Sequence, residues 1–238
     1  MQPLIKFALL PILIPQGLWT KWKTPRLPEA EGERQGTHGL INAKKHLQLL
    51  ILGDSAAAGV GVDQQQEALI GQLCEQFPKQ DYYIDWQLHA TSGHHLGNMI
   101  ERVKTLPEQK FDLVIISSGV NDVIAQHSVQ QWQKNYLTLY QDLENKFASP
   151  HIIFSAVPPI QHFKALPRLL AWFLGQQAAL FNHNLQTQTP YLKRLHYVPL
   201  NLPIAPEYLA KDGFHPSHLS YTIWAQQLVN YLEKTALI

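Results

Sequence analysis

The stretch LLILGDSAAAGVGV, residues 49–62, brings a run of apolar residues to an abrupt end at Gly-Asp-Ser. A short, continuous apolar run such as residues 47–52 is typical of a strand that is buried on both faces of a sheet. The small residues that follow predict a tight turn packed closely on that sheet. The same turn would present Ser55 at the end of the strand, either as a structural residue or as a nucleophile.

Strand and helix signals alternate along the rest of the chain. We predict strands at residues 47–52, 82–88, 113–117, 152–157 and 195–198, and helices at residues 67–77, 96–106, 129–147, 169–185 and 219–232. Ser128 is the expected N-cap of the helix at 129–147. Crossovers of this length join parallel strands and place helices on both faces of the sheet. The sequence therefore predicts a three-layer α/β/α sandwich around a five-stranded parallel sheet.

Length and composition limit the classes of protein to consider. A chain of 238 residues with 45% hydrophobic and 16% charged residues is long enough for one sizeable folded domain. The net charge is +1 and no basic cluster is interleaved with aromatic residues, so we expect no nucleic-acid partner. Cys74 is the only cysteine, which excludes an intrachain disulfide. We expect a cytoplasmic or membrane-associated protein, and the single cysteine is also compatible with export.

The first 39 residues differ in composition from the remainder. We divide the chain into an apolar N-terminal arm with a polar connector, residues 1–39, and a catalytic domain, residues 40–238. Residues 25–39, PRLPEAEGERQGTHG, are typical of an irregular connector.

The arm itself has three interpretations. Pro11 and Pro15 are expected to break a helix, so a membrane span is disfavoured, and no small-residue cleavage site typical of a signal peptide follows. The sequence WTKWK at residues 19–23 combines aromatic and basic residues, which suits a membrane interface. A peripheral membrane contact through residues 3–23, an arm packed on the body of the protein, and a degenerate signal all remain open.

Four unusual motifs lie where a parallel sheet binds its ligands. In such sheets ligands bind beyond the carboxyl ends of the strands. GDSAAAG (53–59), ATSGHHLG (90–97) and SSGVND (117–122) follow the first three predicted strands, and KDGFHPSH (211–218) precedes the last helix. We expect these segments to converge on one site.

The residue types in these motifs indicate nucleophilic catalysis. A serine attacks well only when an adjacent base takes its proton and a third group orients that base. Asp212 precedes His215 by three residues, a spacing that lets the carboxylate reach one ring nitrogen while the other faces Ser55. His215 and His218 lack a carboxylate or cysteine partner at metal spacing, so we predict no metal. We also predict no cofactor, since neither a P-loop nor a GxGxxG motif is present.

Acyl transfer also requires hydrogen-bond donors for the developing oxyanion. The candidate donors are the backbone N–H groups of Ser55 and Gly93 and the side-chain amide of Asn121. We further predict that three residues of the same motifs contact substrate: Asp54, His94 and Asp122.

These residues resemble the four blocks of the SGNH (GDSL-type) hydrolase family. The matching positions, in chain order, are Ser55 in G-D-S, Gly93, Asn121 in G-x-N-D, and Asp212 and His215 in D-x-x-H. The resemblance covers about residues 47–232 and implies a flavodoxin-like sheet and ester hydrolysis through an acyl-serine intermediate. The chain departs from the family at Ala56, where the family's name expects Leu, and it matches the glycine block only loosely. We interpret both departures as substrate tuning.

The expected function is therefore the hydrolysis of small or lipid-like carboxylic esters. The apolar stretch at residues 163–180 could line a pocket for a short- to medium-chain acyl group, or it could simply be a core helix. An O-acyltransferase or a thioesterase would use the same triad. A catalytically silent membrane-surface binding module is the alternative from another class of protein.

Overall fold

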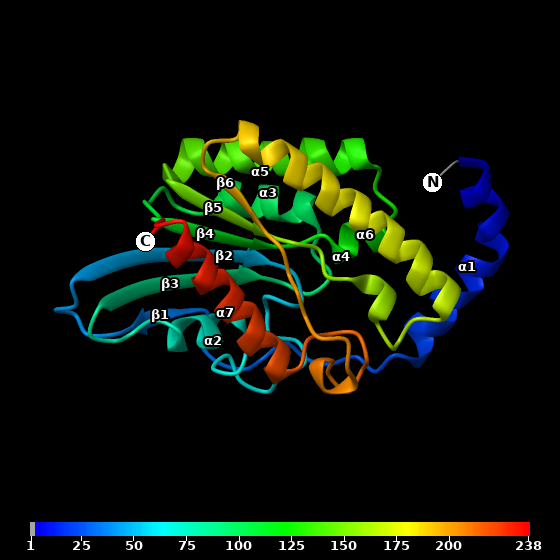
Figure 1. Ribbon diagram of the computed structural model, residues 1–238, viewed down its shortest axis with the longest axis horizontal. Coiled ribbons are helices and arrows are strands. Elements are labelled where there is room, and N and C mark those ends of the chain that lie inside the picture. The colour runs from blue at the N-terminus through cyan, green and yellow to red at the C-terminus, as the bar shows by residue number, and fades with distance from the viewer. Residues whose placement is uncertain (1–2) are drawn as a thin grey trace.

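The computed structural model describes residues 3–238, with side chains from residue 8 onwards. Its centre is a six-stranded sheet in the order β1-β3-β2-β4-β5-β6 (Figure 1). The strands are β1 (Gln35–His38), β2 (Lys45–Gly53), β3 (Tyr82–Ala90), β4 (Leu113–Ser117), β5 (His151–Ser155) and β6 (Leu195–Val198). Strands β2 to β6 are parallel, and β1 pairs antiparallel with β3. Five of the six strands are those predicted from the sequence.

Helices cover both faces of the sheet, which confirms the predicted three-layer architecture (Figure 1). The helices are α1 (Pro3–Lys23), α2 (Leu69–Glu75), α3 (Leu96–Thr105), α4 (Val120–Ile124), α5 (Val129–Phe147), α6 (Arg168–Gln188) and α7 (His218–Lys234), with three short 3-10 helices, η1 (Ile160–His162), η2 (Thr189–Tyr191) and η3 (Pro206–Tyr208). Helices α3, α5 and α6 lie on one face, and α2 and α7 lie on the other. Ser128 caps α5 as predicted, because its Oγ accepts a hydrogen bond from Gln131 N.

The core follows directly from strand alternation. In β2, Leu50 and Leu52 pack among the side chains of α3, α5 and α6, whereas Leu49 and Ile51 pack against α2 and α7. All four are fully buried. Successive side chains of a strand point to opposite faces, so a strand covered on both sides must be apolar at every position. This is why the decisive stretch is a continuous apolar run.

The connector contains a strand that the sequence did not reveal. Residues 35–38, which we expected to be irregular, form the edge strand β1. Only two of its four residues are partly buried, and its pairing with β3 depends on backbone hydrogen bonds. Gly36 also lies against the Trp86 ring, where a Cβ would be 2.9 Å from the nearest ring carbon. A strand this short, with a glycine in it, carries no periodic signal.

Helix α1 runs continuously through Pro11 and Pro15, so the expectation that these prolines break it is wrong. The two prolines are four residues apart and therefore share one face of the helix, and both are exposed. The carbonyl groups that lose a donor consequently lie toward solvent, which can hydrate them. Among the described residues, no helix combines the length and hydropathy that a bilayer crossing requires.

Candidate active site

The turn after β2 holds Ser55 at the carboxyl edge of the sheet. Gly53 ends β2, and a Cβ at this position would lie 2.2 Å from the Cβ of Ala57. Only glycine therefore lets the turn fold back so closely on the strand. Ala57 is itself fully buried, which explains why small residues follow the serine. Ser55 is thus positioned by packing against the sheet rather than by the turn alone.

Three side chains form a hydrogen-bonded series at this edge. Ser55 Oγ lies 2.9 Å from His215 Nε2, and His215 Nδ1 lies 2.6 Å from Asp212 Oδ2. The other oxygen of Asp212, Oδ1, accepts the backbone N–H groups of Phe214 and His215. Burial raises the pKa of the Asp212 carboxyl, but these hydrogen bonds outweigh burial and hold its pKa below the ordinary value. The geometry brings together the three residues predicted from the sequence.

Two backbone donors face no acceptor beside the series. In the described part of the chain, neither Ser55 N–H nor Gly93 N–H has a hydrogen-bond acceptor. Gly93 has φ = +83°, a conformation that favours glycine, and a Cβ there would meet nothing within 4 Å. Glycine is thus required at this position by its backbone conformation and not by crowding.

The third predicted donor, Asn121, is partly engaged. Its Nδ2 donates to the carbonyl oxygen of His94 at 2.8 Å and lies 3.5 Å from Asp54 Oδ2, the outer limit of a hydrogen bond. The amide has two hydrogens, so the first bond fixes the side chain while the second hydrogen stays available to another acceptor. The assignment of Ser55, Gly93 and Asn121 to an oxyanion hole stays a prediction.

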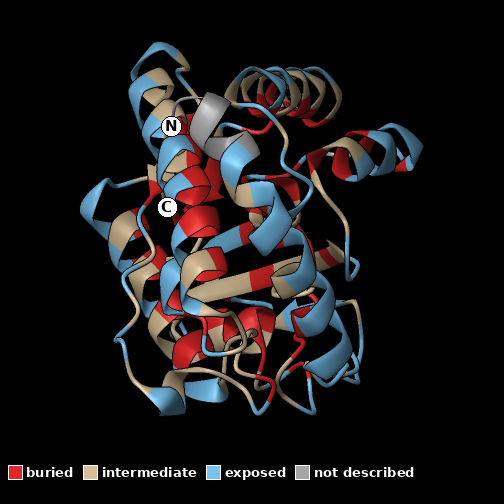
Figure 2. Cartoon of the chain, turned by 90° about the vertical axis from the view of Figure 1, so that its right-hand side faces the viewer, coloured by how far each residue is buried: buried red, intermediate tan, exposed pale blue. Residues whose placement is uncertain are grey.

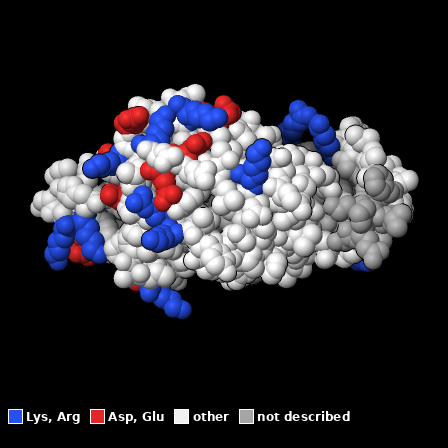
Figure 3. Space-filling view, turned by 90° about the horizontal axis from the view of Figure 1, so that it is seen from above, with Lys and Arg blue, Asp and Glu red and all other residues white. Residues whose placement is uncertain are grey.

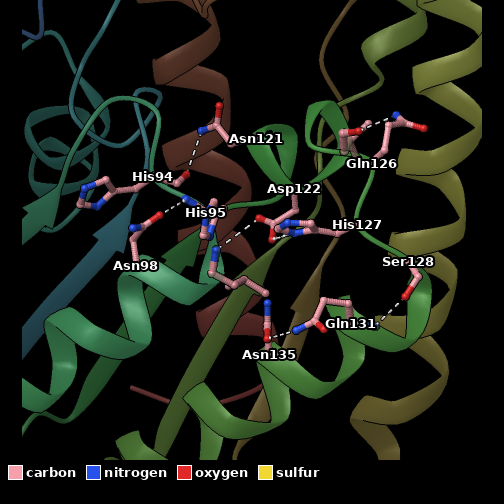
Figure 4. A network of polar contacts seen from close by, with 12 residues as sticks. His94, His95, Asn98, Asn121, Asp122, Gln126, His127, Ser128, Gln131 and Asn135 are labelled. Atoms are coloured by element: carbon pink, nitrogen blue, oxygen red, sulfur yellow. Dashed lines mark hydrogen bonds and ion pairs between the residues drawn. The ribbon is translucent and has the colours of Figure 1, made fainter.

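Asp122, a predicted substrate contact, lies in the interior beside the candidate site. Asp122 is fully buried, and its two oxygens accept hydrogen bonds from His127 Nδ1 and from Leu96 N (Figure 4). Burial raises the pKa of this carboxyl, and the bonds from His127 and Leu96 oppose that rise. Asp122 therefore joins the segment after β4 to the start of α3, and its predicted contact with substrate stays a prediction. The G-x-N-D pattern alone could not separate these roles.

Asp54 and His94 lie at the site in different ways. The Asp54 side chain lines the cavity beside Ser55 but is almost fully buried, and its Oδ1 accepts Ala56 N. Burial raises the pKa of Asp54 to about 7. The His94 ring points away from the labelled network in Figure 4, whereas its backbone oxygen faces Asn121. Their predicted contacts with substrate stay predictions.

An apolar cavity of about 60 Å³ opens beside Ser55. A second chamber of about 100 Å³ adjoins it and shares part of its wall. The residues common to both are Pro158, Phe163, Leu202, Tyr208 and Leu209. The two chambers therefore lie side by side near the serine, between the loops at 156–166 and 199–216, and are together called the Ser55 channel below. Of the apolar stretch at residues 163–180, the two residues that line these chambers are Phe163 and Lys164, which precede α6.

Sequence reasoning missed the residues that hold these loops in place. Glu29 Oε1 accepts Ser92 N at 2.7 Å, which anchors the Gly93 loop to the connector. The Tyr221 hydroxyl lies 2.9 Å from the carbonyl oxygens of Ala56 and Val60, which fixes the Ser55 turn. These partners are 63 or more positions apart in sequence, so no local spacing could have indicated them.

Comparison with known proteins adds a family and a set of similar folds. A model of the GDSL-like lipase/acylhydrolase family matches residues 51–223. No curated protein matches the chain in sequence. Among solved structures, TesA is 17% identical, with a TM-score of 0.63 over 80% of this chain and 99% of TesA. The family 3 carbohydrate esterase of Clostridium thermocellum is 14% identical, with a TM-score of 0.63 over 80% of this chain and 97% of that one.

A third structure, the esterase EstA from Pseudoalteromonas sp. inhibited by monoethylphosphonate, is 19% identical, with a TM-score of 0.58 over 79% of this chain and 98% of EstA. At these identities the likeness to all three structures shows a shared fold alone.

Proposed function

Because the chain belongs to the GDSL-like lipase/acylhydrolase family and is a carboxylic ester hydrolase, we propose that it cleaves esters of short- to medium-chain acids through an acyl-serine intermediate. The observation that carries this proposal is the hydrogen-bonded series from Ser55 Oγ through His215 to Asp212. In this arrangement a nucleophile, a base and an orienting group are already within bonding distance.

Each member of the series has a distinct role in the proposed reaction. Asp212 accepts the Nδ1–H of His215, which leaves the Nε2 lone pair directed at Ser55. His215 takes the proton of Ser55 as Oγ bonds to the ester carbonyl carbon. The same proton then passes to the leaving alcohol as the ester bond breaks. A water molecule, deprotonated by Nε2, next attacks the acyl carbon, and Ser55 is released with its proton restored.

The free donors beside Ser55 support this chemistry. A tetrahedral intermediate carries negative charge on the former carbonyl oxygen, and loss of one donor to that oxygen typically costs about a hundred- to a thousand-fold in rate. We assign Ser55 N–H, Gly93 N–H and the second hydrogen of Asn121 Nδ2 to this task. None of the three needs to break a short hydrogen bond to do it.

The channel supports an apolar acyl group as the part of the substrate that it binds. An apolar cavity of about 150 Å³ holds a benzene-sized molecule. Chambers of about 60 and 100 Å³ therefore suit a short to medium chain better than a long one. Their shared wall is largely proline, phenylalanine and leucine, which favours an acyl chain over a sugar.

The first test is turnover of p-nitrophenyl esters of graded chain length by the full chain, beside labelling with a fluorophosphonate located by mass spectrometry. We expect turnover that declines for long acyl groups, with the label on Ser55. Ser55→Ala should lose both while keeping its thermal transition. Ser128→Ala, a serine at the exposed start of α5, is the matched control and should keep both.

Other outcomes would favour the alternatives. Product partitioning to an added alcohol in preference to water indicates an O-acyltransferase, and preference for acyl thioesters indicates a thioesterase. Absence of both turnover and label in folded protein indicates a silent binding module. Near-full esterase activity in Ser55→Ala would refute the acyl-serine mechanism.

A further inference from the structure

Helix α1 exposes an apolar face that nothing in the described chain covers. We define this α1 face by its six exposed apolar side chains: Leu10, Ile12, Ile14, Leu18, Trp19 and Trp22. Their exposed fractions range from 38% to 83%. Exposed apolar residues that occur singly are ordinary, but a contiguous set of six on one helix marks an interaction surface.

The opposite side of α1 is fixed to the body of the protein. Leu13 is 95% buried in the core, and Gln16 Oε1 accepts Leu170 N in the first turn of α6. Just beyond the helix, the connector is held by the bond from Ala30 N to Ala58 O. The helix is therefore a fixed part of the fold and not a loose tether. Figure 2 shows much of this helix in the colour of exposed residues.

The charge around the α1 face has one sign. Lys21 lies between Trp19 and Trp22, Lys23 and Arg26 follow them, and the first acidic residue of the chain is Glu29. Lys23 Nζ lies 4.5 Å from the Trp19 ring centroid, so a cation and an aromatic ring sit side by side at its end. In the view of Figure 3, the part of the surface toward the N-terminal end shows Lys and Arg but no Asp or Glu.

The α1 face also lies toward the carboxyl edge of the sheet, the edge that holds Ser55. The parallel strands end toward α1 in Figure 1. The segment that lines the channel, including Phe163 and Lys164, leads directly into the turn of α6 that Gln16 contacts. A surface bound to α1 would therefore lie near the channel.

We propose that the α1 face docks the protein on an anionic lipid bilayer. The helix would lie in the plane of the interface, with Leu18 and Trp22 in the acyl boundary and Lys21 and Lys23 among anionic headgroups. The aromatic rings and cations at the C-terminal end of α1 match the headgroup region of an anionic bilayer. A protein partner that covered the apolar side chains of the α1 face would not require positive charge all around them. The proposal concerns binding alone and stands whether or not Ser55 is the nucleophile.

The test is flotation of the full chain with two kinds of vesicle, phosphatidylcholine alone and phosphatidylcholine with one quarter phosphatidylglycerol. We expect partition to the anionic vesicles that weakens as salt is raised. Leu18→Ser/Trp22→Ser should lower the partition at least tenfold. Lys21→Gln/Lys23→Gln should lower it by about 25-fold at low salt, since each cation contributes about fivefold at an anionic surface.

The matched control is Ile41→Ser/Tyr191→Ser, which removes two apolar side chains as exposed as the first pair but outside α1. It should bind as the wild type does. Equal binding to both kinds of vesicle, or no binding, would overturn the proposal. A dimer seen by sedimentation without lipid and lost in Leu18→Ser/Trp22→Ser would also overturn it, because a second copy would then be the partner.

Discussion

Replacing Asp212 with Asn should remove most activity through the tautomer of His215. Asp212 Oδ1 accepts two backbone N–H groups, at 2.9 and 3.0 Å, so an Asn must keep its oxygen at that position. Its NH₂ group then replaces Oδ2, which lies 2.6 Å from His215 Nδ1. A donor there forces Nδ1 to accept and places the ring proton on Nε2. Nε2 can then no longer take the Ser55 proton.

The expected loss is large because the base is held in the wrong form. A triad with a misdirected imidazole loses about 10⁴-fold in kcat, which corresponds to about 5.4 kcal/mol at 1.36 kcal/mol for each factor of ten. KM should change little, since Asp212 is almost fully buried and does not reach the substrate channel. The thermal transition should also be close to that of the wild type, since both backbone hydrogen bonds survive.

The assay is steady-state hydrolysis of a short p-nitrophenyl ester by wild type, Asp212→Asn and Asp212→Ala. Asp212→Ala removes the acceptor without adding a donor, so the ring can adopt either tautomer. We therefore expect Asp212→Ala to be more active than Asp212→Asn, provided that its thermal transition shows a folded protein. If Asp212→Asn kept a tenth or more of the wild-type kcat, the inference that Asp212 fixes the tautomer would be refuted.

Three further predictions follow from other contacts. Glu29→Ala should lower kcat about tenfold with little change in KM, because the hydrogen bond that Ser92 N–H donates to the charged carboxylate is lost. Glu29→Gln keeps an acceptor and should recover most of the lost activity, and equal losses in both variants would contradict this. Because burial raises the pKa of Asp54 from 3.8 to about 7, the folded state binds the carboxyl proton more tightly than the unfolded state does. The stabilisation that this proton gives the folded state is complete below about pH 4 and lost by about pH 7. The free energy of unfolding in urea should therefore change with pH differently in wild type and in Asp54→Asn, by on the order of 4 kcal/mol over this range. The same pH dependence in both proteins would refute this. Ser128→Ala should lower the free energy of unfolding, measured in urea, by about 1 kcal/mol, because the N-cap of α5 is lost. An unchanged urea midpoint would show that the cap contributes nothing to stability.

The anchored N-terminal segment also bears on how the chain should be divided. Residues 1–39 differ in composition from the remainder, yet β1 pairs with β3 and Glu29 bonds to the Gly93 loop. A truncation that removed this segment would therefore expose the edge of β3 and release a loop at the candidate site. Functional work on this protein is best done on the full chain.

Local patterns were enough to predict most of the layers. The apolar run in β2 and the 3.6-residue periodicity of α5 each repeat over several residues, so the signal adds up within one element. The predicted strands and helices lie within three residues of the observed ones. The candidate triad could also be predicted, because the carboxyl ends of all parallel strands lie at one edge of the sheet, where ligands bind.

What the sequence alone determined was thus the order of elements and the chemistry gathered at one edge of the sheet. Only the tertiary structure decided which polar residues line the cavity at Ser55 and which are buried away from it, as Asp122 shows, because burial depends on neighbours from other elements. It also decided that Glu29 holds the Gly93 loop and that α1 passes through two prolines, since packing partners far away in sequence stabilise both. Short-range periodicity carries information on the elements, whereas contacts between distant segments fix the site.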